Sequence, residues 1–214
     1  DNEADMAMFG VYTVHPDGEI IGEYKNEPRV FDNKHDIYLY FFTLSGSLCN
    51  KVYKRILFEN VTWPKITHFE DAFVSIQVFA KAEKFIIIDK SFYYYVQNPA
   101  SSTHSPNRDK MKSDAFQAAD FIVNFTAKSF PEFLPEAFWR KLLIYERIFM
   151  DYAASHEPNR DKILNNLIHE IRKHYAILKS ELKAQHSNIS SRSKNIFKIK
   201  YRAKNFVFVH LPKL

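Results

Sequence analysis

The sequence predicts a mixed α/β protein in which a strand-containing first part is followed by a helical region. Up to about residue 105 the apolar residues form short β-prone runs bounded by turn-forming residues. Beyond that point they recur at spacings of three and four, which is the period of an amphipathic helix. With 214 residues, of which 46% are hydrophobic, the chain can bury a core and is too apolar to be intrinsically disordered.

The first part is expected to open with a β-hairpin. Residues 5–14 and 19–25 are β-prone runs, and Pro16, Asp17 and Gly18 between them are turn formers. Two further apolar runs, KFIIID and SFYYYVQ, predict one or two more strands, of which the first is apolar enough to be buried.

Three helices are expected between these strands. Asp32 or Asn33 would begin a short one in DNKHDIYLYFF, and a second short one would lie in LCNKVYKRILFEN. A longer helix would run from Thr67 to about Glu83. Its core-facing side would carry four residues at spacings of three and four: Phe73, Ile76, Phe79 and Ala80.

The second part is expected to be a bundle of three helices at about 108–128, 132–155 and 159–184. The pentapeptide PNRDK precedes the first and third of them, and we interpret it as one helix-capping solution used twice. One apolar stripe is expected on the middle helix, formed by Phe138, Leu142, Tyr145 and Phe149.

The charge of the chain is unevenly placed. The net charge is +5, yet no acidic residue follows Glu181 and eight lysines and arginines lie beyond it. In residues 192–214 the cations alternate with apolar residues, which suits contact with an anionic membrane surface. Packing of this tail on its own domain is the alternative. No DNA- or RNA-binding motif accompanies the basic tail, so we expect no nucleic-acid partner.

The stretch ITHFEDAF, residues 66–73, combines a structural and a chemical signal. Thr67 and Glu70 have the spacing of a capping box, in which both side chains bond to free amides at a helix start. Asp71 follows directly, so two carboxylates would lie in the first helical turn, where the helix dipole favours negative charge. A general base could be held rigidly there. The acids are therefore either a helix cap alone or a cap that also carries chemistry.

Three segments in this order resemble the acceptor-side half of family-2 glycosyltransferases of the GT-A fold, the bacterial kind that builds surface polysaccharides. They are NEADMAMFGVYTVHPDGEII, SLCNKVYKRILFENV and HFEDAFVSIQVFAKAEKFIIIDKSFYYYVQNPASST. The resemblance covers residues 2 to about 105. It implies an acceptor-side domain at 1–105, a helical region at 106–185 and a basic amphipathic tail at 186–214.

The resemblance also implies roles for individual residues. Asp71 would be the base that deprotonates the acceptor hydroxyl in an inverting transfer, and Glu70 would assist it. Asn50, Lys51 and His68 would contact substrate. A loop of four residues would lie near the donor pyrophosphate: Ser101, Ser102, Thr103 and His104.

The partners implied are a nucleotide-sugar donor and a glycan or lipid-linked acceptor. The complete enzyme would need a divalent metal, Mg²⁺ or Mn²⁺. The donor-binding half and the D-x-D motif that holds this metal are absent from the sequence, so no metal ligand is expected here. A single cysteine, Cys49, favours a cytoplasmic protein, and the tail could bring it to the inner face of the cell membrane. The alternative is a noncatalytic helical module that contacts a membrane or partner protein.

Overall fold

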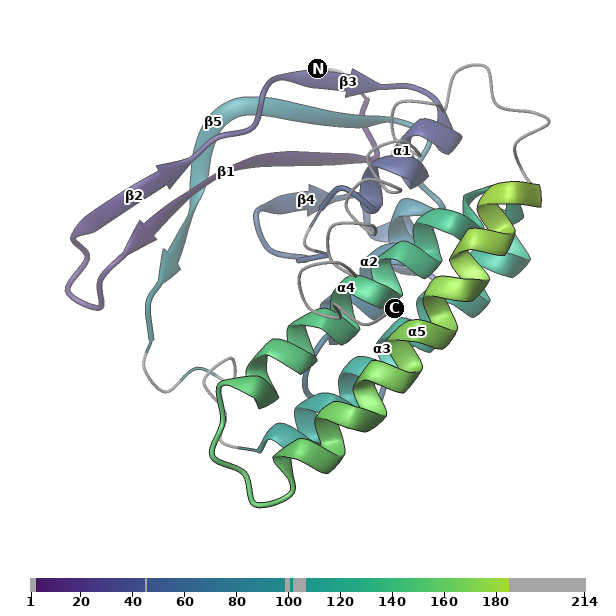
Figure 1. Cartoon of the computed structure of the whole chain (residues 1–214). Helices are drawn as coiled ribbons and strands as arrows, with labels where there is room; N and C mark the ends of the chain where they lie inside the picture. Colours follow the sequence, from purple (N-terminus) through teal and green to yellow (C-terminus); the bar gives the residue numbers. More distant parts are fainter. Residues whose placement is uncertain (1–2, 45, 99–100, 102–106, 185–214) are drawn as a thin grey trace. The chain divides into compact units, whose positions relative to one another are not determined.

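The computed structural model describes residues 3–44, 46–98, 101 and 107–184, and it confirms the mixed α/β class (Figure 1). The chain divides into two compact units, residues 1–114 and 115–214. The basic tail at 186–214 lies outside the described residues. Within the described part of the chain, no helix is long and apolar enough to cross a membrane.

The first unit is built on a five-stranded mixed sheet around β1 (Met6–Val14) (Figure 1). On one side β5 (Phe85–Val96) runs parallel to β1, and β3 (Arg29–Phe31) continues the sheet antiparallel to β5. On the other side β1 pairs antiparallel with β4 (Lys51–Tyr53) and with β2 (Ile20–Tyr24). The predicted hairpin is confirmed as β1 and β2, and the two apolar runs after it form the single strand β5.

Gly10 permits a close approach in the middle of this sheet. The register of β1 against β5 shifts on both sides of Gly10, which lies opposite Ser91. A Cβ atom at position 10 would lie 2.3 Å from the Ser91 Oγ and 2.7 Å from the carbonyl oxygen of Tyr24. Real Cβ atoms do not approach other atoms so closely, so only glycine fits here.

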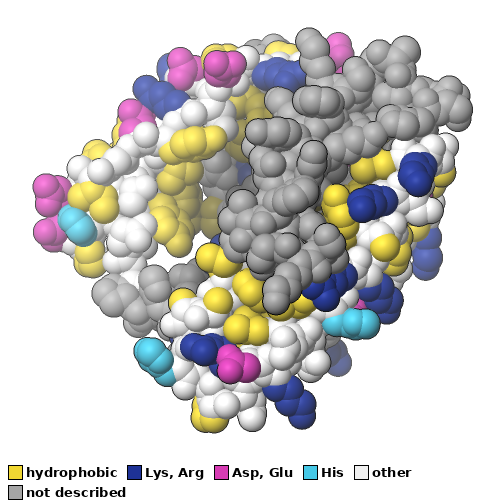
Figure 2. Space-filling view, viewed as in Figure 1, with side chains coloured by type: hydrophobic (Ala, Val, Ile, Leu, Met, Phe, Trp, Pro, Cys, Tyr) yellow, Lys and Arg dark blue, Asp and Glu magenta, His cyan; other side chains and the backbone are white. Residues whose placement is uncertain are grey.

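Beyond this bulge, β1, β2 and β5 continue as a three-stranded arm (Figure 1). Figure 2 shows acidic side chains at the tip of the β1–β2 hairpin and hydrophobic ones along the strands. The large hydrophobic side chains exposed on the arm are Ile20, Ile21, Tyr24, Phe92, Tyr94, Tyr95 and Val96. The sheet is thus well packed at one end and open to solvent at the other.

The core of the first unit joins the sheet to α1 (Lys34–Phe41) and α2 (Glu70–Phe79). Phe85 of β5 stacks on Phe31 with ring centroids 5.5 Å apart, and meets Phe79 of α2 edge-on at 5.6 Å. Such aromatic pairs add about 0.5–1.5 kcal/mol each beyond the burial of their area. The other large and fully buried side chains of this unit are Met6, Met8, Ile37, Tyr38, Phe41 and Ile76.

The first predicted short helix is confirmed and the second is wrong. α1 begins after Asn33, whose side-chain oxygen accepts hydrogen bonds from two backbone N–H groups. The second segment instead forms β4 and a 3-10 helix, η1 (Arg55–Phe58). Asn50 has a left-handed φ of 55°, and its backbone carbonyl and side chain both bond to Phe9 of β1. Pairing with β1 therefore overrides the local helical pattern.

The second unit contains the predicted helices, and the boundary between the units falls inside α3 (Arg108–Ser129). A short 3-10 helix, η3 (Pro131–Phe133), leads into α4 (Leu134–Ala153), and α5 (Arg160–Ala184) follows. The PNRDK segments lie at the starts of α3 and α5, as expected. Of the predicted stripe on α4, Leu142 and Tyr145 are buried, while Phe138 and Phe149 are half-buried.

Candidate functional site

The candidate catalytic acids lie in the first turn of α2, but the helix is not capped as predicted. The N-cap is Phe69, which has a left-handed φ of 64° and makes no side-chain cap hydrogen bond. The predicted capping box is wrong, because the Thr67 hydroxyl donates to the Asp114 Oδ2 at 3.1 Å. The left-handed residue turns the chain before the helix, and the Thr67 hydroxyl donates to a buried carboxylate, which is a strong acceptor because it is charged. Glu70 is exposed and Asp71 is half-buried.

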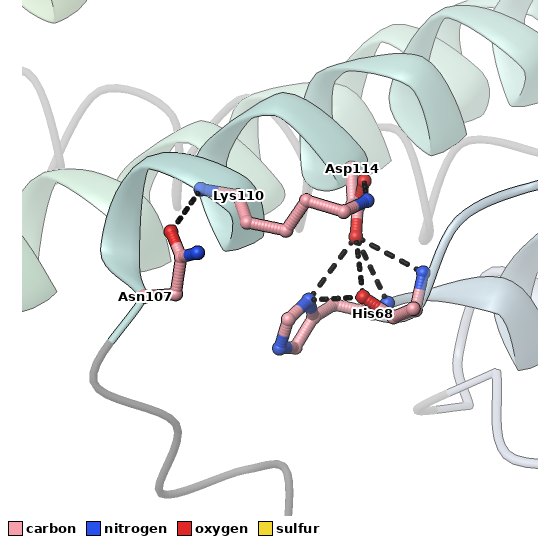
Figure 3. A network of polar contacts seen from close by, with 5 residues as sticks. His68, Asn107, Lys110 and Asp114 are labelled. Atoms are coloured by element: carbon pink, nitrogen blue, oxygen red, sulfur yellow. Dashed lines mark hydrogen bonds and ion pairs between the residues drawn. The ribbon is translucent and has the colours of Figure 1, made fainter.

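Asp114, at the end of the first unit, fixes the segment that leads into α2 (Figure 3). Its Oδ2 accepts from the backbone N–H groups of Thr67 at 3.0 Å and His68 at 3.2 Å, and from the His68 Nδ1 at 3.1 Å. Its Oδ1 pairs with the Lys110 Nζ at 2.5 Å. Burial alone would raise the pKa of Asp114, but the hydrogen bonds from Lys110, Thr67 and His68 hold it well below its usual range. The carboxylate is therefore ionised and accepts from all of these donors.

The contacts of Asp114 indicate which nitrogen of the His68 ring carries a proton. Because an ionised carboxylate can only accept, the His68 Nδ1 carries the proton in this hydrogen bond. The other ring nitrogen, Nε2, is buried and has no hydrogen-bond partner among the described residues. A buried polar atom without a partner costs about 1–3 kcal/mol, so a partner from a ligand would remove that cost. The substrate contact that the resemblance implies for His68 stays a prediction.

Lys51 of β4 lies within electrostatic range of Asp71. Its Nζ donates to the Ser47 carbonyl oxygen at 2.8 Å and to the Asn50 Oδ1 at 3.1 Å. Burial lowers the pKa of Lys51 to about 8, and the negative charges of Cys49 and Asp71 oppose that shift. Lys51 therefore holds the loop before β4 and keeps a cation close to the candidate base.

Tyr53 joins the same cluster from the same face of β4. Its hydroxyl donates to the Leu48 carbonyl oxygen at 3.1 Å. Burial raises its pKa, and the charges of Cys49 and Asp71 raise it further. From β5, Tyr93 hydrogen-bonds to Cys49, which also raises the pKa of this tyrosine. The structure thus brings together side chains from β4, β5 and the start of α2.

An aromatic series extends from this cluster to the surface. The Tyr53 ring meets Phe58 edge-on with centroids 5.3 Å apart, and Phe58 stacks on Trp63 at 6.3 Å. The side chain of Trp63 is 62% exposed. The backbone beside it is fixed, because the buried Gln77 side chain of α2 bonds to both the N–H and the C=O of Thr62 at 2.9 Å. Trp63 is therefore an exposed ring on a rigid segment.

The structure describes Ser101 of the predicted pyrophosphate loop. Ser101 is half-buried and its N–H donates to the Asn98 carbonyl oxygen at 3.0 Å. Ser102, Thr103 and His104 lie outside the described residues. Among the residues that are described, no group of three or more His, Cys, Asp or Glu side chains could hold a metal ion.

Sequence reasoning missed Asp114 and Tyr53. The alternation in KVY would have placed Lys51 and Tyr53 on one face had the segment been recognised as a strand. Nothing local marks Asp114, because its role arises from residues far away in the sequence. Comparison with protein-family models and with curated proteins finds no match to this chain.

Proposed function

We propose that this chain is the acceptor-side part of an inverting glycosyltransferase resembling family 2. The substrates are a nucleotide-sugar donor and the hydroxyl of a glycan or lipid-linked acceptor. The donor-binding half and its divalent metal are assigned to sequence outside these residues. The process served would be polysaccharide biosynthesis.

In the proposed reaction Asp71 acts as the general base. Its carboxylate takes the proton of the acceptor hydroxyl, and the resulting oxygen attacks the anomeric carbon of the donor sugar. The new glycosidic bond forms as the bond to the nucleotide phosphate breaks, and the nucleoside diphosphate leaves with that electron pair. Inversion follows from a single displacement. Glu70 is exposed next to Asp71 and is proposed to bind or orient the sugar.

The proposal is supported most by the electrostatic interaction between two residues that the resemblance names separately. Asp71 lies at the start of α2 and Lys51 in β4, yet the charge of one acts on the other. His68 adds a buried nitrogen without a partner among the described residues. Such a displacement needs a base at the acceptor hydroxyl, and a cation and an imidazole can hydrogen-bond the substrate oxygens around it.

The aromatic series gives the proposed acceptor a second contact. Trp63, Phe58 and Tyr53 lead from the surface to the residues around Asp71. An exposed ring on a rigid backbone can pack against the apolar face of a sugar at little cost in conformational entropy. Trp63→Ala in the complete gene product should raise the acceptor KM several-fold and leave kcat and the donor KM near wild type. Phe92→Ala, which removes another exposed ring of the first unit, is the matched control.

The proposed activity is tested with the complete gene product, a panel of nucleotide sugars and Mg²⁺ or Mn²⁺. Transfer to a glycan or lipid-linked acceptor is expected, with a product of inverted anomeric configuration. The 214-residue chain alone should bind donor weakly and transfer nothing. Retention of configuration, or full turnover by this chain alone, would overturn the proposal.

A noncatalytic role at a membrane is the second candidate, and the alternating basic and apolar residues of 192–214 favour it. Flotation with liposomes containing anionic lipid tests whether the tail contacts a membrane. The intact chain should float and a version ending at 191 should not. Equal recovery of both would remove the membrane contact from either candidate.

A further inference from the structure

We propose that Asp114 is a positioning residue for the candidate base, which it holds in place through the segment before α2. This inference rests on the proposed function, because it assigns a role in the same site. Asp114 touches neither Glu70 nor Asp71 in the contacts described above. It acts on Thr67 and His68, the residues that precede the left-handed Phe69 and the helix start.

The start of α2 needs an external anchor. Its N-cap residue, Phe69, makes no side-chain hydrogen bond, and the side-chain bond within the first turn comes from Asp71, whose Oδ1 accepts from the Ala72 N–H at 2.8 Å. The first backbone hydrogen bond of the helix runs from the Phe73 N–H to the Phe69 carbonyl oxygen at 3.2 Å. Glu70 and Asp71 lie between these two residues, so their placement depends on how Phe69 is held.

Asp114 supplies that anchor with four hydrogen bonds to two consecutive residues. One carboxylate oxygen binds both the backbone and the side chain of Thr67 and of His68, at 3.0 to 3.2 Å. The Asp114 side chain is fully buried, and its second oxygen is taken by Lys110 one turn earlier on α3. All donors converge on a single anion, and charged acceptors form the stronger hydrogen bonds. The segment is therefore fixed in position as well as stabilised.

The same anchor fixes the orientation of His68. The bond from its Nδ1 to Asp114 sets the proton on that nitrogen and leaves Nε2 with no partner among the described residues. An anionic partner that orients an imidazole in this way determines which nitrogen a ligand meets. Loss of Asp114 should therefore disturb two proposed site residues together, His68 and Asp71.

Asp114→Asn is the informative variant because it keeps the shape and removes the charge. Only one of its two terminal atoms can accept, so its NH₂ group must face either Lys110 or the donors of Thr67 and His68. Lys110→Met combined with Asp114→Asn removes the first conflict and should restore part of the anchor. Asp120→Asn is the matched control. Asp120 lies on α3, as Asp114 does, and the change weakens its ion pair with Lys141 of α4.

The first experiment measures amide hydrogen exchange in the 214-residue chain, with the ring ¹⁵N shifts of His68. In Asp114→Asn the amides of Thr67, His68 and Phe73 should exchange about tenfold faster than in Asp120→Asn. The His68 ring signals should also lose the pattern of a proton on Nδ1, and the double variant should recover part of both. Unchanged exchange and ring signals in Asp114→Asn would overturn the anchor. If Asp114→Asn does not fold, the double variant is compared with Asp120→Asn instead.

The second experiment measures kinetics in the complete gene product. Asp114→Asn should lower kcat about tenfold or more with the donor KM within about twofold, since small misplacement of a base costs rate rather than binding. Asp120→Asn should keep its kcat. If exchange accelerates while kcat stays at the control value, Asp114 is structural only and the positioning role is refuted. If the wild type shows no transfer at all, the proposed function fails, and the exchange result still decides whether the anchor exists.

Discussion

Each unit of the protein holds a histidine with little exposure to solvent, and the two are held in different ways. His174, on α5, donates from Nδ1 to the Glu170 carbonyl oxygen at 2.7 Å, and its ring meets Tyr145 edge-on at 5.3 Å. The Glu170 carboxylate lies 3.7 Å from the same nitrogen, so the polar contacts of this ring come from its own helix. His68 instead bonds to the buried anion Asp114 of another element and leaves Nε2 without a partner among the described residues. The two rings therefore differ in whether their anchor is local or distant in the sequence.

Two aspartates of α3 pair with lysines, and the pairs differ in which partner is buried. In the first unit the anion is buried: the Asp114 side chain is fully buried, and its partner Lys110 is 42% exposed. In the second unit the cation is buried: Lys141 is 8% exposed, and its partner Asp120 is 56% exposed. Lys141 also lies 5.5 Å from the centre of the Tyr145 ring, which is a packing contact. A buried anion collects donors from a loop, whereas a buried lysine stem fills space.

The largest expected difference between the units is in stability. Asp114→Ala should cost about 3 kcal/mol of unfolding free energy, because it leaves several partly buried donors of Thr67 and His68 without their acceptor. Asp120→Ala should cost less, because Asp120 is 56% exposed and a single partner, Lys141, loses its acceptor. Urea unfolding of both variants measures the difference. Equal losses would contradict the contrast between the two pairs.

Lys51 sharpens the comparison because its ammonium bonds to neutral oxygens, unlike that of Lys141. Burial lowers its pKa to about 8, so the folded chain holds fewer protons than the unfolded chain between pH 8 and about 10.5. Stability should therefore rise with pH in that window, by up to about 1.4 kcal/mol per unit relative to Lys51→Met. The ¹³Cε signal of Lys51 should titrate near pH 8. A midpoint near that of exposed lysines would remove its assignment as a buried cation.

His174 should show a smaller effect in acid. Burial lowers its pKa, the Glu170 carbonyl opposes this, and the cations Lys141 and Lys173 act in the same direction as burial. The unfolded chain takes up the proton first, so stability should fall as the pH drops below about 6.5. His174→Gln should remove about 1 kcal/mol or less of this dependence between pH 7 and pH 5. An unchanged slope in the variant would show that other groups cause it.

The smallest expected effect is at Glu70. Because no capping box forms, Glu70→Ala should change the unfolding free energy by less than about 0.5 kcal/mol. Thr67→Ala should cost about 1 kcal/mol, because it removes a hydrogen bond to a charged group. Thermal unfolding distinguishes the two. A loss at Glu70 as large as that at Thr67 would restore the cap as the explanation of this motif.

The sequence predicted the elements whose signals are local. The β1–β2 hairpin follows from its turn residues, α1 from Asn33, and the long helices from their apolar period. The prediction was wrong where tertiary contacts decide: residues 51–53 pair with β1, and Thr67 bonds to Asp114 instead of capping α2. Asp71 and Lys51 could be named from the resemblance, but their proximity could not be derived from spacing. Asp114 could not be singled out, because the donors of Thr67 and His68 that it binds come from another element.

The central claim is that Asp71 is a base and not only a residue of a helix start. Asp71→Asn in the complete gene product tests it most directly, because the amide keeps the size of the side chain and cannot accept the acceptor proton. Turnover should fall by about a hundredfold or more, while folding and the donor KM stay near wild type. A folded Asp71→Asn enzyme with nearly full transfer activity would contradict the account.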